Sequence, residues 1–397
     1  MRVSMQGIAI ITRHRNENKI NSPLLFLLYF LFTPKWVNFI QNYCPNIAAD
    51  LHRFEQHSIA LTMYCKTKHY LLLLGCILSI FSSAQSVQVL SAGTKSSFRG
   101  LSVVDDQTLW VSGSAGTVGR SIDGGQSWQW LNVKGYEKTD FRDIEAFDAQ
   151  NAIIMGIASP AYILKTTDAG QSWSKVYENR DTSMFLDAMD FVDAQHGIVI
   201  GDPIQGRVFM AETADGGNSW QEVPMNERPA VATGEAFFAS SGTNVRLYSP
   251  TQYALASGGK QANLFLSGKK TKLPLVQGKE TTGSNSVALK GKKTLIVVGG
   301  DFMTKDSTTL NCFVSTNGGK TFAAPKNGPH GYRSCVEYLG QKNWIACGLN
   351  GVDFTTNEGK NWSWISKESF HVCRKAKNGS AVYFAGGGGR IGKLISN

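Results

Sequence analysis

Short apolar runs alternate with turn-forming residues along the chain from residue 85 onward. Apolar residues at 141–144 and 152–156 flank a turn at 148–151, and the same order recurs at 185–191, 193–196 and 197–201. Strands of this length, separated by Gly, Asp, Asn and Ser every ten or so residues, are typical of an all-β array. Long amphipathic helical patterns are absent from this part of the sequence, which excludes helical solenoids and coiled coils.

Five segments share the pattern Ser/Thr-x-Asp/Asn-x-Gly-x-Ser/Thr/Asn-Trp/Phe. Their acidic or amide positions are Asp123, Asp168, Asp215, Asn317 and Asn357, and their aromatic ends are Trp128, Trp173, Trp220, Phe322 and Trp362. Asp or Asn accepts hydrogen bonds from turn amides, and Gly permits a positive φ. The aromatic ring then packs between neighbouring sheets. We interpret these segments as structural turns and their acids as non-catalytic.

The five segments are separated by steps of 45, 47, 102 and 40 residues. The step of 102 spans two periods, so one repeat has lost its signature. Seven first strands are predicted, near Phe98, Phe141, Phe185, Glu235, Ser286, Tyr332 and Phe370. The last repeat has only three strands, and a spare strand at 87–90 precedes the first. We therefore predict a seven-bladed β-propeller of four-stranded antiparallel blades, closed by the N-terminal strand.

Residues 63–84 have the pattern of a secretory signal peptide, with a basic start, an apolar run at 71–81 and small residues before Gln85. We expect an exported protein, periplasmic or extracellular, whose propeller occupies 85–397 as one domain. Cys76 ends a Leu-Leu-Gly-Cys sequence, so a lipoprotein is an alternative. Residues 1–62 are interpreted as a non-native upstream extension or a disordered segment; a genuine extension with a membrane-associated segment is the alternative.

The net charge of +10 does not predict a nucleic-acid partner. Residues 1–84 contain eight Lys and Arg and only three Asp and Glu, so half of the surplus lies in the leader. The cluster of Lys269, Lys270 and Lys272 is interpreted as a solvated face or loop. The apolar run at 71–81 is too short for a stable membrane span.

Four cysteines follow the leader: Cys312, Cys335, Cys347 and Cys373. Cys335 and Cys347 flank a predicted hairpin turn near Gly340, so a disulfide and two buried free thiols both remain open. No metal site is expected, because no C-x-x-C pair is present. No nucleotide cofactor is expected either: Gly387 to Gly392 fits G-x-G-x-x-G, but too few residues follow for the helix that holds a pyrophosphate.

The repeated segments resemble the Asp-box (BNR) repeats of sialidase-type propellers. The match is closer to bacterial relatives of the photosystem II stability/assembly factor family, and it is carried by FRDIEAFDAQNA, AYILKTTDAGQSW, DAMDFVDAQHGIVIGDP, GEAFFASSG and GYRSCVEYLG. The resemblance covers roughly residues 90–397. It implies a binding scaffold for assembly intermediates, since plastid and cyanobacterial members are not known as enzymes.

Residues at the starts of the innermost strands line the central channel of a propeller, and here they include Arg99, Arg142, Arg333 and His371. Arginines that converge there would suit a carboxylate. Strand alternation is expected to point Tyr332 away from the side that Arg333 faces. We expect a monomer that binds a protein partner or a glycan at this face.

A glycoside hydrolase of sialidase type, acting on acidic glycans, is the alternative function. Glu235 with Asp143 or Asp187 would supply its pair of carboxylates. The same charges could instead form salt bridges that hold the blades in register.

Overall fold

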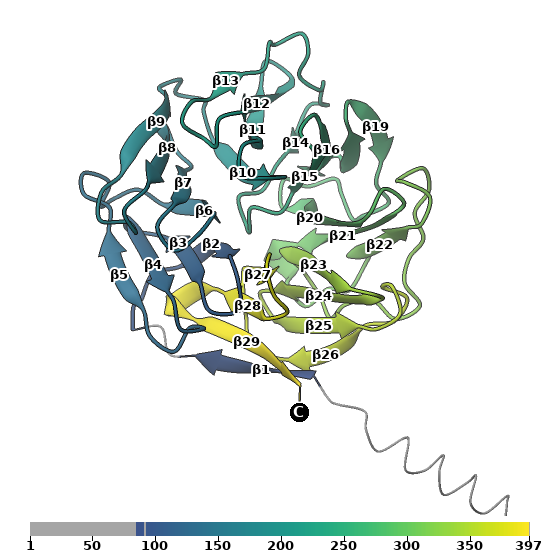
Figure 1. Ribbon diagram of the computed structural model, residues 1–397. Helices are drawn as coiled ribbons and strands as arrows, with labels where there is room; N and C mark the ends of the chain where they lie inside the picture. Colours follow the sequence, from purple (N-terminus) through teal and green to yellow (C-terminus); the bar gives the residue numbers. More distant parts are fainter. Residues whose placement is uncertain (1–84, 91–92, 397) are drawn as a thin grey trace, which may run out of the picture. The chain divides into compact units, whose positions relative to one another are not determined.

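A computed structural model describes residues 85–90 and 93–396. The predicted signal peptide, the upstream extension and Cys76 lie outside the described residues. The described chain forms a ring of seven antiparallel sheets around a central channel (Figure 1). The prediction of an all-β, seven-bladed propeller is confirmed. In the described ranges, no helix has the length and apolar character needed to cross a membrane.

The first three blades follow the predicted repeat. Blade 1 contains β2 (Phe98–Val103), β3 (Leu109–Gly113), β4 (Thr117–Ser121) and β5 (Gln129–Asn132). Blade 2 contains β6 (Phe141–Ala146), β7 (Ala152–Gly156), β8 (Ala161–Thr166) and β9 (Ser174–Asn179). Blade 3 contains β10 (Leu186–Phe191), β11 (Gly197–Ile204), β12 (Arg207–Thr213) and β13 (Gln221–Glu222).

Blades 4 and 5 depart from the predicted repeat. Blade 4 contains β15 (Val245–Ser249), β16 (Gln252–Ala256), β18 (Asn263–Leu266) and β19 (Lys269–Lys272). Blade 5 contains β20 (Thr282–Lys290), β21 (Thr294–Asp301) and β22 (Cys312–Ser315), joined by the short strands β14 (Glu235–Ala236) and β17 (Gly258–Gly259). A short 3₁₀ helix, η2 (Phe302–Thr304), follows β21.

Blade 6 contains β23 (Cys335–Gly340), β24 (Asn343–Gly348), β25 (Gly351–Thr355) and β26 (Ser363–Ser366). Blade 7 contains β27 (Val372–Lys375), β28 (Val382–Ala385), β29 (Ile391–Ser396) and the first strand, β1 (Gln85–Leu90). The 3₁₀ helix η3 (Gly387–Gly389) joins β28 to β29, so the glycine-rich motif lies at a turn between strands, as predicted.

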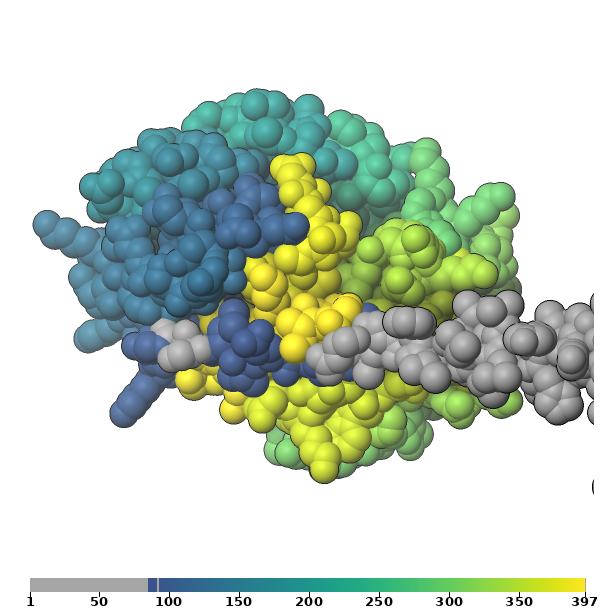
Figure 2. All heavy atoms as spheres, turned by 60° about the horizontal axis from the view of Figure 1, so that its bottom comes forward, coloured from purple at the N-terminus to yellow at the C-terminus, as the bar shows by residue number. Residues whose placement is uncertain are grey.

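Both ends of the propeller meet in blade 7. β1 pairs antiparallel with β29 over six residues, from Gln85 opposite Ser396 to Leu90 opposite Ile391. Figure 2 brings this edge of the ring forward and shows atoms of the first strand, in blue, against those of the last, in yellow. The predicted closure by an N-terminal strand is confirmed.

Burial follows from the face-to-face packing of the blades. The inner strands are covered by a neighbouring blade on both faces, so β7 and β11 are apolar in continuous runs and do not alternate. The outermost strands β5 and β13 are largely exposed. Six apolar clusters fill the spaces between neighbouring blades among the described residues, and one of them spans both sides of blade 7.

Blade 4 is the repeat that lacks an Asp-box turn. Its innermost strand begins at Val245, so the prediction that it begins near Glu235 was wrong; Glu235 lies in β14. A tight turn at Ser267 and Gly268, both at positive φ, replaces the Asp-box between β18 and β19. The cluster of Lys269, Lys270 and Lys272 belongs to the outer strand that follows.

The Asp-box turns have the predicted geometry. Asp123 accepts hydrogen bonds from the Ser121 hydroxyl (2.8 Å), the Ser127 amide (2.9 Å) and the Ser127 hydroxyl (2.5 Å). The indole of Trp128 donates to the Gly125 carbonyl at 3.2 Å. Where the acid is replaced by Asn317, its Oδ1 accepts from the Thr321 amide at 3.0 Å and its Nδ2 donates to the Thr321 hydroxyl at 2.7 Å.

Substitution of Asp123 tests this role. We expect Asp123→Ala to lower the midpoint of thermal unfolding by roughly 2–5 °C, because the donors in the turn lose their acceptor. Asp123→Asn should lower it much less, since Asn317 makes equivalent contacts in the same position of its turn. Calorimetry of the two variants measures the difference, and equal losses would contradict the role of Asp123 as the acceptor in the turn.

Candidate binding site at the channel mouth

A segment between β14 and β15 crosses the channel, and we call residues 238–244 the channel plug. The hydroxyl of Ser241 donates to the Ser334 carbonyl of blade 6 at 2.7 Å. The hydroxyl of Thr243 donates to that of Ser286 in blade 5, also at 2.7 Å. On the opposite side, Arg99 of blade 1 donates to the carbonyl of Ser240 at 3.5 Å. The plug therefore joins the walls of the channel.

Two further blades hold the plug from the other end of the channel. Arg374 of blade 7 donates to the carbonyls of Ser241 (3.4 Å) and Gly242 (3.3 Å). Gly242 has φ +64° and lies against the carboxyl group of Asp143 in blade 2, where a Cβ atom would collide with that group. Small residues are needed here because the chain passes close to the surrounding side chains.

The channel-mouth cavity lies at the end of the channel where the innermost strands begin. Its volume is about 480 Å³, and its wall includes Arg99, Arg142 and His371, three of the four residues predicted for the channel face. These residues come from blades 1, 2 and 7. The structure thus brings together the predicted basic group, except for Arg333.

Positive charge in this cavity is only partly neutralised. Arg142 forms an ion pair with Asp140 at 2.8 Å. The pKa of Arg99 is lowered by burial and by the nearby charge of Arg142. Burial and Arg99 lower the pKa of His371 to about 4, so its ring is neutral at pH 7; its Nδ1 lies 2.8 Å from the Phe98 carbonyl. Two guanidinium groups close together at a cavity wall suit an anionic ligand.

Aromatic side chains form a second part of the wall. Phe238 packs edge-on against Phe302 with ring centroids 5.9 Å apart, and Phe302 packs against Tyr332 at 6.3 Å. The Tyr332 hydroxyl donates to Asn285 Oδ1 at 2.8 Å, and burial raises its pKa. Sequence reasoning missed this wall, although the Phe-Phe pair at 237–238 within a Gly- and Ser-rich segment is its sequence signal.

Arg333 does not reach the cavity. Its side chain is fully buried in blade 6, where it is ion-paired with Asp353 and donates to Asn350 Oδ1 at 2.5 Å. Tyr332, not Arg333, lines the cavity. Tyr332 and Arg333 point to opposite sides, as predicted, but Tyr332 faces the channel and Arg333 faces the core of blade 6. The reason is that β23 begins only at Cys335, so both residues lie in the loop before the strand.

Glu235 does not face the cavity either. Its side chain is fully buried and forms an ion pair with Lys270 at 2.7 Å. Its carboxylate also accepts from the Ser257 hydroxyl (2.5 Å) and from Asn263 Nδ2 (2.9 Å). These contacts satisfy both oxygens and tie β14 to blade 4, which is the structural role that the sequence had left open.

Asp143 and Asp187 have partners different from those of Glu235. Asp143 is buried at the far side of the plug, accepts from the amides of Ile144 (2.9 Å) and Met189 (2.8 Å), and has its pKa raised to about 8 by burial. Asp187 is buried, and among the described residues the amide of Ala239 is a weak donor to its carboxyl group. Burial, with Asp202 nearby, raises its pKa well above the usual value. None of the three acids lines the channel-mouth cavity, so the catalytic pair stays a prediction.

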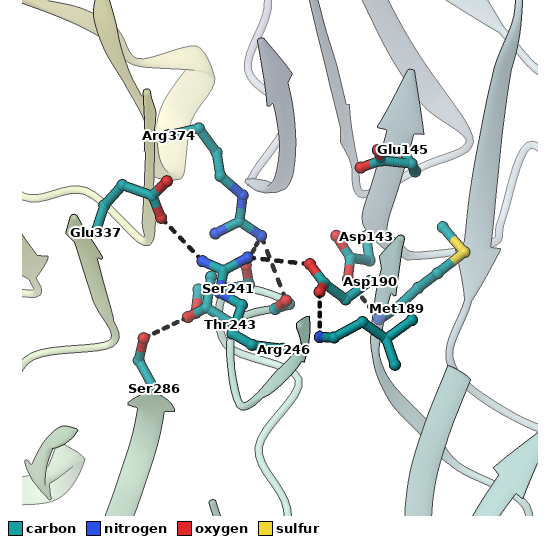
Figure 3. A network of polar contacts seen from close by, with 12 residues as sticks. Asp143, Glu145, Met189, Asp190, Ser241, Thr243, Arg246, Ser286, Glu337 and Arg374 are labelled. Atoms are coloured by element: carbon teal, nitrogen blue, oxygen red, sulfur yellow. Dashed lines mark hydrogen bonds and ion pairs between the residues drawn. The ribbon is translucent and has the colours of Figure 1, made fainter. Parts of the chain in front are cut away.

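A smaller cavity lies at the other end of the channel and is lined by charged side chains (Figure 3). Arg246 pairs there with Asp190 at 3.2 Å and with Glu337 at 2.9 Å. Lys377 pairs with Glu145. Acids and bases from different blades are matched in this network, and two of the three ion pairs join blades that are not neighbours in the ring. This is expected for salt bridges that hold the blades in register. At the channel mouth, Arg142 pairs with Asp140, but Arg99 forms no ion pair within the described ranges.

The ionisation of Asp187 predicts a pH dependence. Its folded pKa lies above the unfolded value of about 3.9, so the folded state binds the proton more tightly and loses stability as pH rises between these two values. We expect Asp187→Asn to raise the unfolding midpoint at pH 8 by at least about 2 °C and to leave it nearly unchanged at pH 4. Thermal unfolding at both pH values checks this, and an equal gain at both would contradict it.

The close fit at the plug predicts a second stability effect. Gly242→Ala should lower the unfolding midpoint several-fold more than Gly268→Ala. Both glycines have positive φ, but nothing lies near the position of a Cβ atom at Gly268. The control variant should lose roughly 2 °C from backbone strain alone. Equal losses would show that the contact between Gly242 and Asp143 is not tight.

Comparisons with known proteins identify similar propellers. Residues 81–181 match a family model described as photosynthesis system II assembly factor YCF48. A solved structure, YCF48 bound to D1 peptide, is 16% identical, with 78% of this chain and 97% of that chain covered and a TM-score of 0.57. YCF48 from Cyanidioschyzon merolae is 14% identical, with 78% and 98% covered and a TM-score of 0.57.

The WD40 propeller domain of Doa1 is 13% identical, with 79% of this chain and 98% of that chain covered and a TM-score of 0.54. No curated protein matches the sequence. At these identities the solved structures share the fold with this chain.

Proposed function

We propose that this YCF48-like BNR propeller is an exported, non-catalytic scaffold that binds a peptide segment of a protein partner at the channel-mouth cavity. The observation that carries the proposal is the pair Arg99 and Arg142 beside an aromatic wall. A peptide carboxylate would accept hydrogen bonds from the guanidinium groups, and apolar side chains would pack on the rings. YCF48, which has the same fold, has been solved with a D1 peptide bound.

The cavity favours binding over glycoside hydrolysis. Glycosidases that act through a pair of carboxylates, as considered for Glu235, need both carboxyl groups on either side of the scissile bond. Asp202 is the one acid on the wall of this cavity in the described chain, and Glu235, Asp143 and Asp187 are absent from it. Ala239 and Ser240 of the plug also line the cavity, which suits a short segment that enters from the mouth.

Peptide arrays test this function. Each short peptide is synthesised with a free and with an amidated C-terminus, and Asp- or Glu-containing peptides are compared with their Asn and Gln counterparts. We expect retention of peptides that carry a carboxylate. Arg99→Ala and Arg142→Ala should each weaken binding by about 10- to 100-fold, as for the loss of a charge-assisted hydrogen bond. Titration calorimetry with the best peptide measures the change.

Arg180→Ala is the matched control, because this arginine is exposed and pairs with Glu178 on blade 2. Its affinity should match that of the unchanged protein. Retention that does not depend on Arg99 or Arg142, or no retention of any peptide, would contradict the proposal. Turnover of an acidic glycoside by the same protein would favour the hydrolase instead.

A further inference from the structure

Three cysteine thiols meet in the core between blades 6 and 7. Cys335 belongs to β23, Cys347 to β24 and Cys373 to β27, and all three side chains are fully buried. Their sulfur atoms all lie within 4.8 Å of one another. The sequence placed Cys335 opposite Cys347, and the register confirms it. It gave no sign that Cys373 of the next blade joins them.

Contacts single out Cys335 and Cys373 as the reactive pair. Their sulfur atoms are 3.6 Å apart, and the Cys373 amide donates to the sulfur of Cys335 at 3.4 Å. Cys347 is a neighbour of Cys335 in the same sheet, so their Cβ atoms project in the same direction. Cys373 comes from the facing sheet and points toward Cys335. Bridging requires Cβ vectors that approach each other, which favours the pair across the two blades.

Ionisation of the cluster supports the same pair. Burial alone would raise the pKa of Cys335, but the thiols of Cys347 and Cys373 and the charge of Arg374 together hold it well below its usual value. The Arg374 guanidinium lies 3.9 Å from the sulfur. Burial and the neighbouring Cys335 raise the pKa of Cys373. Of the three thiols, Cys335 therefore loses its proton most readily, and a thiolate is the attacking species in disulfide exchange.

We propose that Cys335 and Cys373 form a disulfide that cross-links blade 6 to blade 7 when the protein folds in the presence of a disulfide oxidant such as oxidised glutathione. The Cys335 thiolate attacks the oxidant and releases one glutathione thiolate. Cys373 loses its proton and attacks the Cys335 sulfur of the mixed disulfide, which releases the second glutathione. Two protein thiols are oxidised, and one glutathione disulfide is reduced to two thiols.

The surroundings favour a disulfide over a bound soft metal. The thiols belong to an apolar cluster that also contains Phe98, Val372 and Phe384. A disulfide is neutral and leaves this cluster uncharged. A soft divalent metal ion such as zinc takes four ligands, and in the described part of the chain this group supplies only the three thiols.

Peptide mapping of the full chain tests the proposal. The protein is refolded with oxidised and reduced glutathione, alkylated and digested with trypsin without reduction. Cleavage at Lys and Arg places the three cysteines on separate peptides, 334–342, 343–360 and 368–374. We expect 334–342 linked to 368–374, with 343–360 alkylated at Cys347. The link should also raise the unfolding midpoint by roughly 5 °C relative to the reduced protein.

Two variants separate the cross-link from general packing effects. Cys347→Ser should keep both the link and the gain in unfolding midpoint on oxidation, whereas Cys373→Ser should lose both. A link between 334–342 and 343–360, full alkylation of all three peptides, or a bound metal ion in the mass spectrum would overturn the proposal. Because the mapping is done on the unchanged protein, a variant that fails to fold leaves the test intact.

Discussion

Closure of the ring is the constraint on which the rest of this structure depends. Seven blades pack face to face, and each inner strand is buried only if both of its neighbours are present. Blade 7 receives its fourth, outermost strand when β1 pairs with β29, so residues from opposite ends of the propeller complete one sheet. Radial packing also forces the starts of seven strands toward one axis. Charged side chains at this axis must pair with an opposite charge, point away from the channel or remain free to bind a ligand.

The two ends of the channel accommodate these charged side chains differently. Beyond the plug, Arg246, Asp190 and Glu337 neutralise one another. At the mouth, Arg99 donates to a plug carbonyl and remains beside Arg142, with phenylalanine rings around them. One end of the channel is therefore a structural junction. The other is a cavity that combines positive charge with apolar surface, and these are the properties that the proposed peptide ligand requires.

Periodic features could be predicted from the sequence because each repeat carries its own local chemistry. The Asp-box turns, the strand-to-strand turn at the glycine-rich motif and closure by residues 87–90 are set by short-range patterns. The start of β15 could not be predicted in this way, because the insertion before it satisfies its polar groups through blades distant in sequence. Arg333 shows the same limit: its partner Asp353 lies in β25, and the loop before β23 decides whether Tyr332 or Arg333 faces the channel.

The channel plug has a consequence for the order of folding. Ser240 bonds to a residue 141 positions earlier, and Ser241 to residues 93 and 133 positions later. Such distant contacts are satisfied only after the blades on both sides are built, and long-range pairing is slow because loop-closure entropy opposes it. During synthesis the plug and the unpaired edge of β29 are completed last. The plug, which borders the channel-mouth cavity, is thus among the final parts of the chain to become ordered.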